Sequence, residues 1–226
     1  MPEPRPETGS RKIVLINPNT SVRTTAMMAG IARTYLPAGF TVEALTAETG
    51  VSMIVNPQEL AASVPGVVTM GLSAAASADG IIVGAFGDPG LEQLRQNLVI
   101  PVTGICEASM LEASIGARRF AIATVTPLLV ESFAEKAKNL GLSHLYAGTR
   151  LTEGDPIALA QDPERLHAAL LDATRKCFDE DRAEAVIIGG GPLGQAAMRL
   201  QQELSAPVIA PIRSAVIRLL GEMAEI

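Results

Sequence analysis

The sequence lacks the residues that mark several protein classes. It has two cysteines, no tryptophan and only 3% aromatic residues in 226 positions. Cys106 and Cys177 lie far apart and no secretion signal is evident, which excludes a disulfide framework and indicates a reducing, cytoplasmic location. No Cys/His cluster has the spacing of metal ligands, so we expect no metal site.

Positive charge and long apolar runs are missing as well. The net charge is −6 and no basic stripe is present, so we expect no nucleic-acid partner. No apolar run approaches the about 20 residues of a membrane span, so we expect no membrane partner. Residues 1–11 are rich in proline and charge without the apolar segment of a signal peptide, and we expect a disordered tail.

What remains is an aliphatic chain in which strand-like and helix-like segments alternate. This alternation predicts an α/β fold with parallel sheets covered by helices. Short apolar runs predict strands at 12–16, 40–45, 100–103 and 119–123 and around residue 145. Helical patterns cover 57–75, 89–97, 107–115, 127–140 and 163–178, and a last helix starts at 211 and ends near 225.

One pattern occurs twice, about half a chain apart. Residues 78–91 form an apolar strand that runs into a glycine turn, and residues 183–194 do the same. Aligning the two places Asp79 on Glu184, Gly84 on Gly189 and Ala85 on Gly190. The strand at 119–123 aligns with the first strand in the same way, so that Thr124 falls on Asn17 and Thr126 falls on position 19.

The repeat predicts two pseudo-symmetric lobes, each a parallel sheet covered by helices, with the active site in the cleft between them. Ligands of such sheets bind outside the carboxyl ends of the strands. We expect residues 12–105 and part of the C-terminal region to form the first lobe, and about 106–210 to form the second.

The motifs in these positions resemble one known family. Residues 17–20 (Asn-Pro-Asn-Thr), 86–91 (Phe-Gly-Asp-Pro-Gly-Leu), 101–105 (Pro-Val-Thr-Gly-Ile) and the turn at Gly189 are similar to the aspartate/glutamate/hydantoin racemase superfamily, and most of all to its hydantoin and allantoin racemases. The resemblance implies the two-lobed fold. It also implies a small-molecule substrate whose Cα lies between two cysteines, one of which removes a proton while the other returns it.

This chain departs from that pattern where the chemistry takes place. The two cysteine positions map onto Ala85 and Gly190, and neither side chain can transfer a proton. Cys106 does not align with either position. The glycine turns would still present backbone N–H groups to an oxyanion. We expect the substrate-binding residues at the strand ends and turns, namely Asn17, Ala85, Phe86, Gly87, Thr124, Thr126, Gly190, Gly191, Pro192 and Leu193.

Two carboxylates are candidates for catalysis. Asp88 is a candidate general base, with the alternative that it is the N-cap of a helix beginning at Pro89. Glu107 is a second candidate, with the alternative that it ties a neighbouring turn at a helix start. We expect Cys106 and Cys177 to be packing residues, and His144 and His167 to lie on the surface.

The sequence therefore predicts a racemase-like isomerase that acts on a small carboxylate, hydantoin or ureide without the two-cysteine pair. A lyase, decarboxylase or hydrolase in the same cleft is one alternative. An inactivated racemase that only binds a small acid or ureide is another. The glycine turns lack the full dinucleotide fingerprint, so no cofactor is implied, and the family resemblance implies a homo-oligomer.

Overall fold

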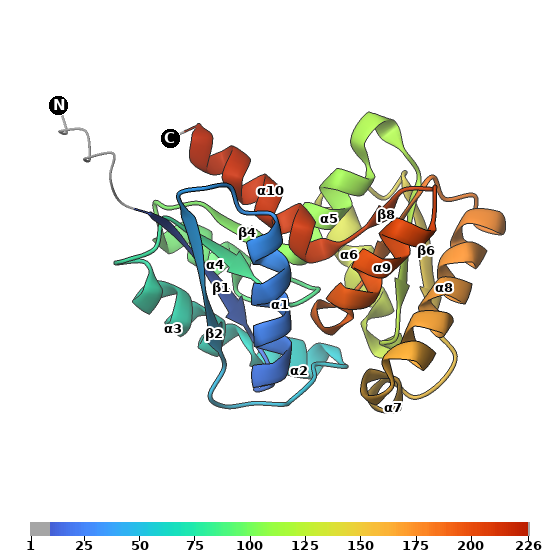
Figure 1. Ribbon diagram of the computed structural model, residues 1–226, viewed down its shortest axis with the longest axis horizontal. Helices are drawn as coiled ribbons and strands as arrows, with labels where there is room; N and C mark the ends of the chain where they lie inside the picture. Colours follow the sequence, from blue (N-terminus) through green and yellow to red (C-terminus); the bar gives the residue numbers. More distant parts are fainter. Residues whose placement is uncertain (1–9, 226) are drawn as a thin grey trace.

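The computed structural model describes residues 10–225 and consists of two lobes side by side (Figure 1). The first sheet has the strand order β2-β1-β3-β4 and the second has the order β6-β5-β7-β8, and every pair is parallel. The identical orders confirm the predicted α/β fold and its internal repeat. Most of the predicted tail lies outside the described residues, but Arg11 belongs to β1.

The strands of the first lobe are β1 (Arg11–Asn17), β2 (Phe40–Thr46), β3 (Gly80–Val83) and β4 (Val102–Gly104). Its helices are α1 (Val22–Thr34), α2 (Pro57–Ala62), α3 (Val64–Ala74) and α4 (Leu91–Asn97), and α5 (Ile105–Ala113) follows β4. The single helix expected over 57–75 is wrong. Pro65 lacks an N–H and cannot donate to the carbonyl four residues before it, but it is tolerated in the first turn of a helix. The first helix therefore ends at Ala62 and a new helix starts at Val64.

The strands of the second lobe are β5 (Phe120–Thr124), β6 (Tyr146–Leu151), β7 (Ala185–Ile188) and β8 (Val208–Ile209). Its α-helices are α6 (Val130–Asn139), α7 (Pro156–Gln161), α8 (Pro163–Asp179), α9 (Gly194–Glu203) and α10 (Pro211–Ala224). Short 3-10 turns cover Ile115–Ala117, Pro127–Leu129 and Gly191–Leu193. Helix α7 was not expected from the sequence.

Hydrogen bonds at equivalent places verify the alignment of the two halves. The Gly84 N–H donates to Ile16 O and the Gly189 N–H donates to Ala123 O, both at 2.8 Å. At the other end of the sheets, the Lys12 N–H donates to the Asp79 carboxylate at 2.7 Å. The Arg119 N–H donates to the Glu184 carboxylate at 2.8 Å in the same way. The two halves therefore repeat each other in structure as well as in sequence.

The two lobes exchange a helix and share one core. Helix α5 follows the first sheet but contacts β7 and β8, whereas α10 follows the second sheet and contacts β3 and β4. The two helices also pack on each other between the lobes (Figure 1). A single apolar cluster joins Ile82 of the first sheet, Ile187 of the second and Leu219 of α10. This shared core places the strand ends of one sheet beside those of the other.

Candidate functional site

A cavity lies at the strand ends between the lobes, where the repeat predicts the site. It holds about 490 Å³ of empty space, counting its open mouth. Seven of the expected binding residues line it: Ala85, Phe86, Thr126, Gly190, Gly191, Pro192 and Leu193. The other lining residues are Asn19, Met53, Ile54, Leu60, Gly84, Val125, Leu129, Phe133 and Gly189.

The two glycine turns approach each other closely across this cavity. A Cβ on Gly191 would lie 2.7 Å from the carbonyl oxygen of Gly84, and a Cβ on Gly189 would lie 2.7 Å from Ile122 Cγ2. Neither position can therefore carry a side chain without moving its neighbours. Ala85 and Gly190 follow these glycines, so the two positions that the family resemblance assigns to cysteine do line one cavity.

Asn17 lies behind the cavity and orients Asn19. Asn17 is fully buried, and its Nδ2 donates to Asn19 Oδ1 and to Thr25 Oγ1, both at 2.9 Å. The Ser21 N–H also donates to Asn19 Oδ1 at 2.9 Å. With its oxygen held twice, Asn19 has its Nδ2 left as a donor, and that group makes no hydrogen bond within residues 10–225. Asn19 was missed as a lining residue, although Thr126 occupies the equivalent position.

The second lobe supplies a hydrogen-bond acceptor from the matching place. Thr124 Oγ1 donates to the Gly189 carbonyl at 2.6 Å, which uses its only proton. Thr126 Oγ1 lies 3.1 Å from Thr124 Oγ1 and must therefore be the donor of that bond. Thr126 keeps its lone pairs for the cavity. The cleft thus has a donor from the first lobe, Asn19, and an acceptor from the second, Thr126.

Asp88 does not line the cavity, and it caps a different helix from the expected one. Its backbone φ is +52°, and Gly87 and Gly90 also have positive φ, so the chain cannot be helical there and α4 begins at Leu91. The Asp88 carboxylate accepts the N–H groups of Cys106 and Glu107 at 2.8 Å each, at the start of α5. A Cβ on Gly104 would overlap this carboxylate. Asp88 is therefore the cap of α5.

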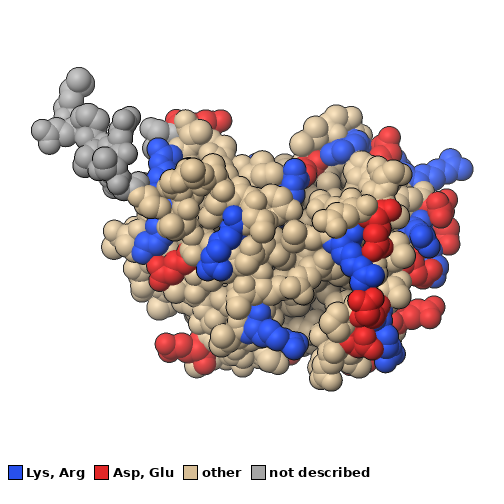
Figure 2. Space-filling model, in the orientation of Figure 1, with Lys and Arg blue, Asp and Glu red and all other residues tan. Residues whose placement is uncertain are grey.

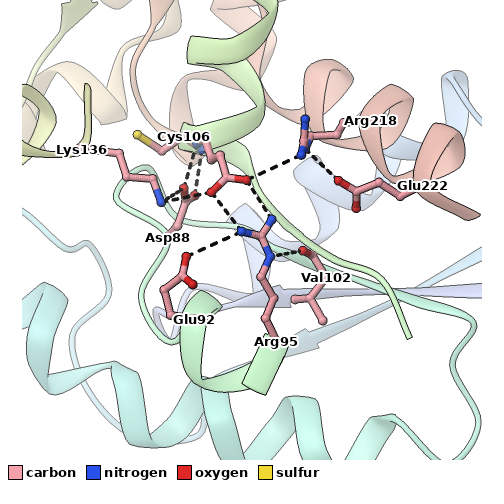
Figure 3. Close-up of polar contacts among 9 residues, drawn as sticks. Asp88, Glu92, Arg95, Val102, Cys106, Lys136, Arg218 and Glu222 are labelled. Atoms are coloured by element: carbon pink, nitrogen blue, oxygen red, sulfur yellow. Dashed lines mark hydrogen bonds and ion pairs between the residues drawn. The ribbon is translucent and has the colours of Figure 1, made fainter. Parts of the chain in front are cut away.

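Glu107 is likewise absent from the cavity wall and belongs to an ion cluster with Arg95, Lys136 and Arg218, three residues that Figure 3 labels. Arg95 forms two hydrogen bonds to its carboxylate, at 2.8 and 3.1 Å. Burial alone would raise the pKa of Glu107, but the bonds and charge of Arg95, with Lys136 and Arg218 nearby, lower it below the usual value. A carboxylate held in this way is a poor base. No titratable side chain is found among the cavity-lining residues that the structure describes.

Neither cysteine reaches the cavity, and both are buried in the core. Burial raises the pKa of Cys106 well above its usual value, and it raises the pKa of Cys177 to about 12. Both thiols therefore stay protonated at neutral pH and behave as packing groups. His144 is exposed as expected, but the surface position expected for His167 is wrong, because α9 covers it and its Nε2 lies 2.9 Å from Glu203.

Between residues 10 and 225 no three His, Cys, Asp or Glu residues gather as metal ligands do. Over the same stretch no helix is both long and apolar enough to span a bilayer.

Gly87, which the sequence predicts as a substrate-binding residue, lies outside the cavity wall, with its Cα next to Leu60.

Comparisons with known proteins agree with this architecture. A hydantoin racemase from Pseudomonas sp. (strain NS671) is 29% identical to this chain, and the match covers 88% of this chain and 80% of the relative. A hydantoin racemase from Rhizobium meliloti is 30% identical, and the match covers 90% of this chain and 85% of the relative. The solved structure of allantoin racemase from Klebsiella pneumoniae superposes with a TM-score of 0.90, at 28% identity, covering 96% of this chain and 89% of the other. The family profile described as Asp/Glu/Hydantoin racemase matches residues 13–219. This chain belongs to the Asp/Glu/hydantoin racemase family.

Proposed function

We propose that this family member holds a hydantoin or related ureide ring in the cleft between its lobes and does not racemise it by a two-cysteine mechanism. The observation that carries the proposal is the cavity wall. It combines a free amide donor, a free hydroxyl acceptor and apolar groups, and it includes no titratable side chain within the described residues.

The polar pair matches the edge of a ureide ring. Such an edge alternates carbonyl acceptors with N–H donors, so Asn19 Nδ2 would donate to a carbonyl and Thr126 Oγ1 would accept an N–H. The remaining side chains that line the cavity are apolar, among them Met53, Ile54 and Leu60. None of the described residues that line the cavity is a cation that could offset the desolvation of a carboxylate, so a neutral ring with an apolar substituent fits better than aspartate or glutamate.

None of the described side chains in the cavity wall can transfer a proton to or from a substrate. The family resemblance assigns the two proton-transferring positions to Ala85 and Gly190, and both residues line the cavity. Methyl groups and hydrogens cannot exchange protons with a substrate carbon. The buried thiols of Cys106 and Cys177 lie elsewhere, so they do not replace the missing pair.

A second candidate is an enzyme, an isomerase, lyase or hydrolase that works through backbone N–H groups. The N–H groups of Ala85 and Gly191 form no hydrogen bond within residues 10–225, and both residues line the cavity. Two such donors on facing turns would stabilise a carbonyl oxygen that gains negative charge, as in an enolate. Turnover separates this candidate from a protein that only binds the ring.

The test is proton NMR in deuterated water with single enantiomers of isopropylhydantoin, allantoin, aspartate and glutamate. We expect saturation transfer to isopropylhydantoin, with its Cα proton signal intact and no product. Loss of the Cα signal at a catalysed rate would contradict the proposal, and new product peaks would favour the second candidate. Asn19→Leu should weaken binding about 5-fold, because it removes one hydrogen bond worth about 1 kcal/mol.

Restoring the thiols tests the missing step directly. Ala85 already has a Cβ, and a Cβ on Gly190 would lie 3.0 Å from Leu193 Cγ, so only the leucine side chain must shift. We expect Ala85→Cys combined with Gly190→Cys to exchange the Cα proton. The matched control, Ala85→Ser with Gly190→Ser, has nearly the same size but no acidic thiol and should leave the signal intact.

A further inference from the structure

We propose that Lys136 and Asp88 form an ionic latch between the lobes, and that this latch positions the wall of the cavity for ligand binding. The ligand part rests on the proposed function, whereas the latch itself does not. Lys136 lies on α6 of the second lobe, and Asp88 lies in the turn after β3 of the first. Lys136 Nζ is 3.1 Å from Asp88 Oδ2, and Figure 3 shows the two side chains pointing toward each other.

The latch residues connect directly to the cavity wall. Asp88 comes two residues after Phe86 and its N–H donates to Ala85 O at 3.0 Å, which closes the turn that carries both lining residues. On the other lobe, Phe133 precedes Lys136 by three positions and so lies on the same face of α6. Phe86 and Phe133 meet edge to face, with ring centroids 5.0 Å apart. Helix α6 therefore holds this turn by an aromatic contact and an ion pair.

The pair is sheltered from solvent, which makes it more than a surface contact. The Asp88 side chain is fully buried, and the Lys136 side chain is 17% exposed. Burial raises the pKa of Asp88, and the charge of Lys136 and the N–H groups at the start of α5 oppose this rise. For Lys136, burial would lower the pKa, but Asp88 raises it above the usual value. Removing Lys136 leaves the buried Asp88 carboxylate without this cation, which is costly for a charge that water does not reach.

The neighbouring ion pairs do not have the same geometry. Arg95 and Glu107 both follow strands of the first sheet, and Arg218 approaches Glu107 only to 3.9 Å. In this cluster Lys136 is the cation contributed by α6, and it also lies 3.5 Å from Glu107. Breaking Arg95–Glu107 should therefore lower stability without separating α6 from the turn. Breaking Lys136–Asp88 should let the two sides of the cavity move apart.

The latch is tested by the distance between the lobes. Spin labels on Gln93→Cys in α4 and Arg175→Cys in α8 report this distance, because both positions are exposed while the native thiols are buried. We expect Lys136→Met to broaden the distance distribution, and Lys136→Arg, which keeps the charge, to restore it. The matched control Lys138→Met changes an exposed lysine on the same helix and should have no effect. Arg95→Met should reduce the unfolding midpoint without broadening the distribution.

Ligand affinity supplies the second measurement. If the closed arrangement falls to about one tenth of the population, affinity for isopropylhydantoin falls about 10-fold. If Lys136→Met folds and its distance distribution is the same as that of the parent protein, the proposed latch is contradicted. If Lys136→Met does not fold, Asp88→Asn is measured instead, with the same broadening expected and the same unchanged distribution as the contrary result. Broadening in a protein whose parent binds no hydantoin would keep the latch and reject the proposed function.

Discussion

The two halves share one topology but fill the turn after the third strand of each sheet differently. Counting on from the aligned glycines places Asp88 of the first half on Leu193 of the second. Asp88 caps α5 and bonds to Lys136, whereas Leu193 packs into the apolar cluster of the second lobe. The same scaffold is thus stabilised by a buried ion pair on one side and by apolar packing on the other. The ionic version joins this turn to α6 across the cleft.

A second difference lies in the polar residues at the strand ends. The first half has amides at positions 17 and 19, and the second half has hydroxyls at 124 and 126. In both halves the first residue of each pair is buried and holds the second at the cavity. The repeat therefore conserves the arrangement while changing donor to acceptor. A pseudo-symmetric fold gains an asymmetric site in this way.

The largest effect is expected from truncating the ionic turn. Asp88→Ala removes the acceptor of two helix N–H groups and leaves Lys136 without its nearest partner, so we expect a loss of about 3–5 kcal/mol of unfolding free energy. Urea denaturation followed by circular dichroism measures this loss. The matched change Leu193→Ala should cost about 2–3 kcal/mol, because it only leaves a cavity. Equal sensitivity of both variants to salt would contradict the ionic assignment.

The repeat and the site location could be predicted from the sequence because they depend on local patterns. The aligned glycines and strand ends place Ala85, Gly190 and Thr126 at one cleft, and all three line one cavity in the structure. The positions of Asp88 and Glu107 were not predictable from the same patterns. Their partners, Lys136 on α6 and Arg95 on α4, come from tertiary packing, and an Asp before a proline is equally compatible with a local cap.

The apolar part of the wall was missed for a similar reason. Met53 and Ile54 lie in the loop between β2 and α2, and Met53 packs against the core of the second lobe. A loop residue that crosses to another lobe has no periodic signal in the sequence.

The face drawn in Figure 2 shows acidic and basic residues interspersed rather than gathered into one basic patch, which fits the mild negative charge read from the composition.

A medium effect is expected from Glu107→Gln, with a defined pH dependence. Because the pKa of Glu107 is lowered in the folded protein, its stabilisation is complete above the unfolded value of 4.5 and is lost as the pH falls through the folded value. We expect the variant to be about 1–3 kcal/mol less stable at pH 7. The difference from wild type should shrink below pH 4.5. A difference that stays constant down to pH 3 would contradict the ion cluster as its source.

The second half offers a weaker counterpart to that pair. Arg150 binds Asp181 through two hydrogen bonds of 2.7 Å, and this contact lowers the pKa of Asp181. The pair lies near the surface, so we expect Asp181→Asn to cost less than about 1 kcal/mol, with the loss screened by salt. Urea denaturation at low and high salt compares it with Glu107→Gln. An equal cost for both would mean that burial does not set the difference between the halves.

The smallest effects are expected where the halves agree. Asp79 and Glu184 each accept a backbone N–H at the start of the first strand of their lobe, from Lys12 in β1 and from Arg119 just before β5. Asp79→Asn and Glu184→Gln keep an acceptor but remove the charge, so each should cost about 0.5–1.5 kcal/mol. Because Glu184 is more exposed than Asp79, its variant should lie at the lower end. Amide hydrogen exchange at Lys12 and Arg119 tests this directly. The Lys12 N–H should exchange faster in Asp79→Asn and the Arg119 N–H should exchange faster in Glu184→Gln, while each keeps its wild-type exchange rate in the other variant. Exchange that rises at both sites in either variant would show that the sheets loosen together, and the two halves would then be one cooperative unit in spite of their separate sheets.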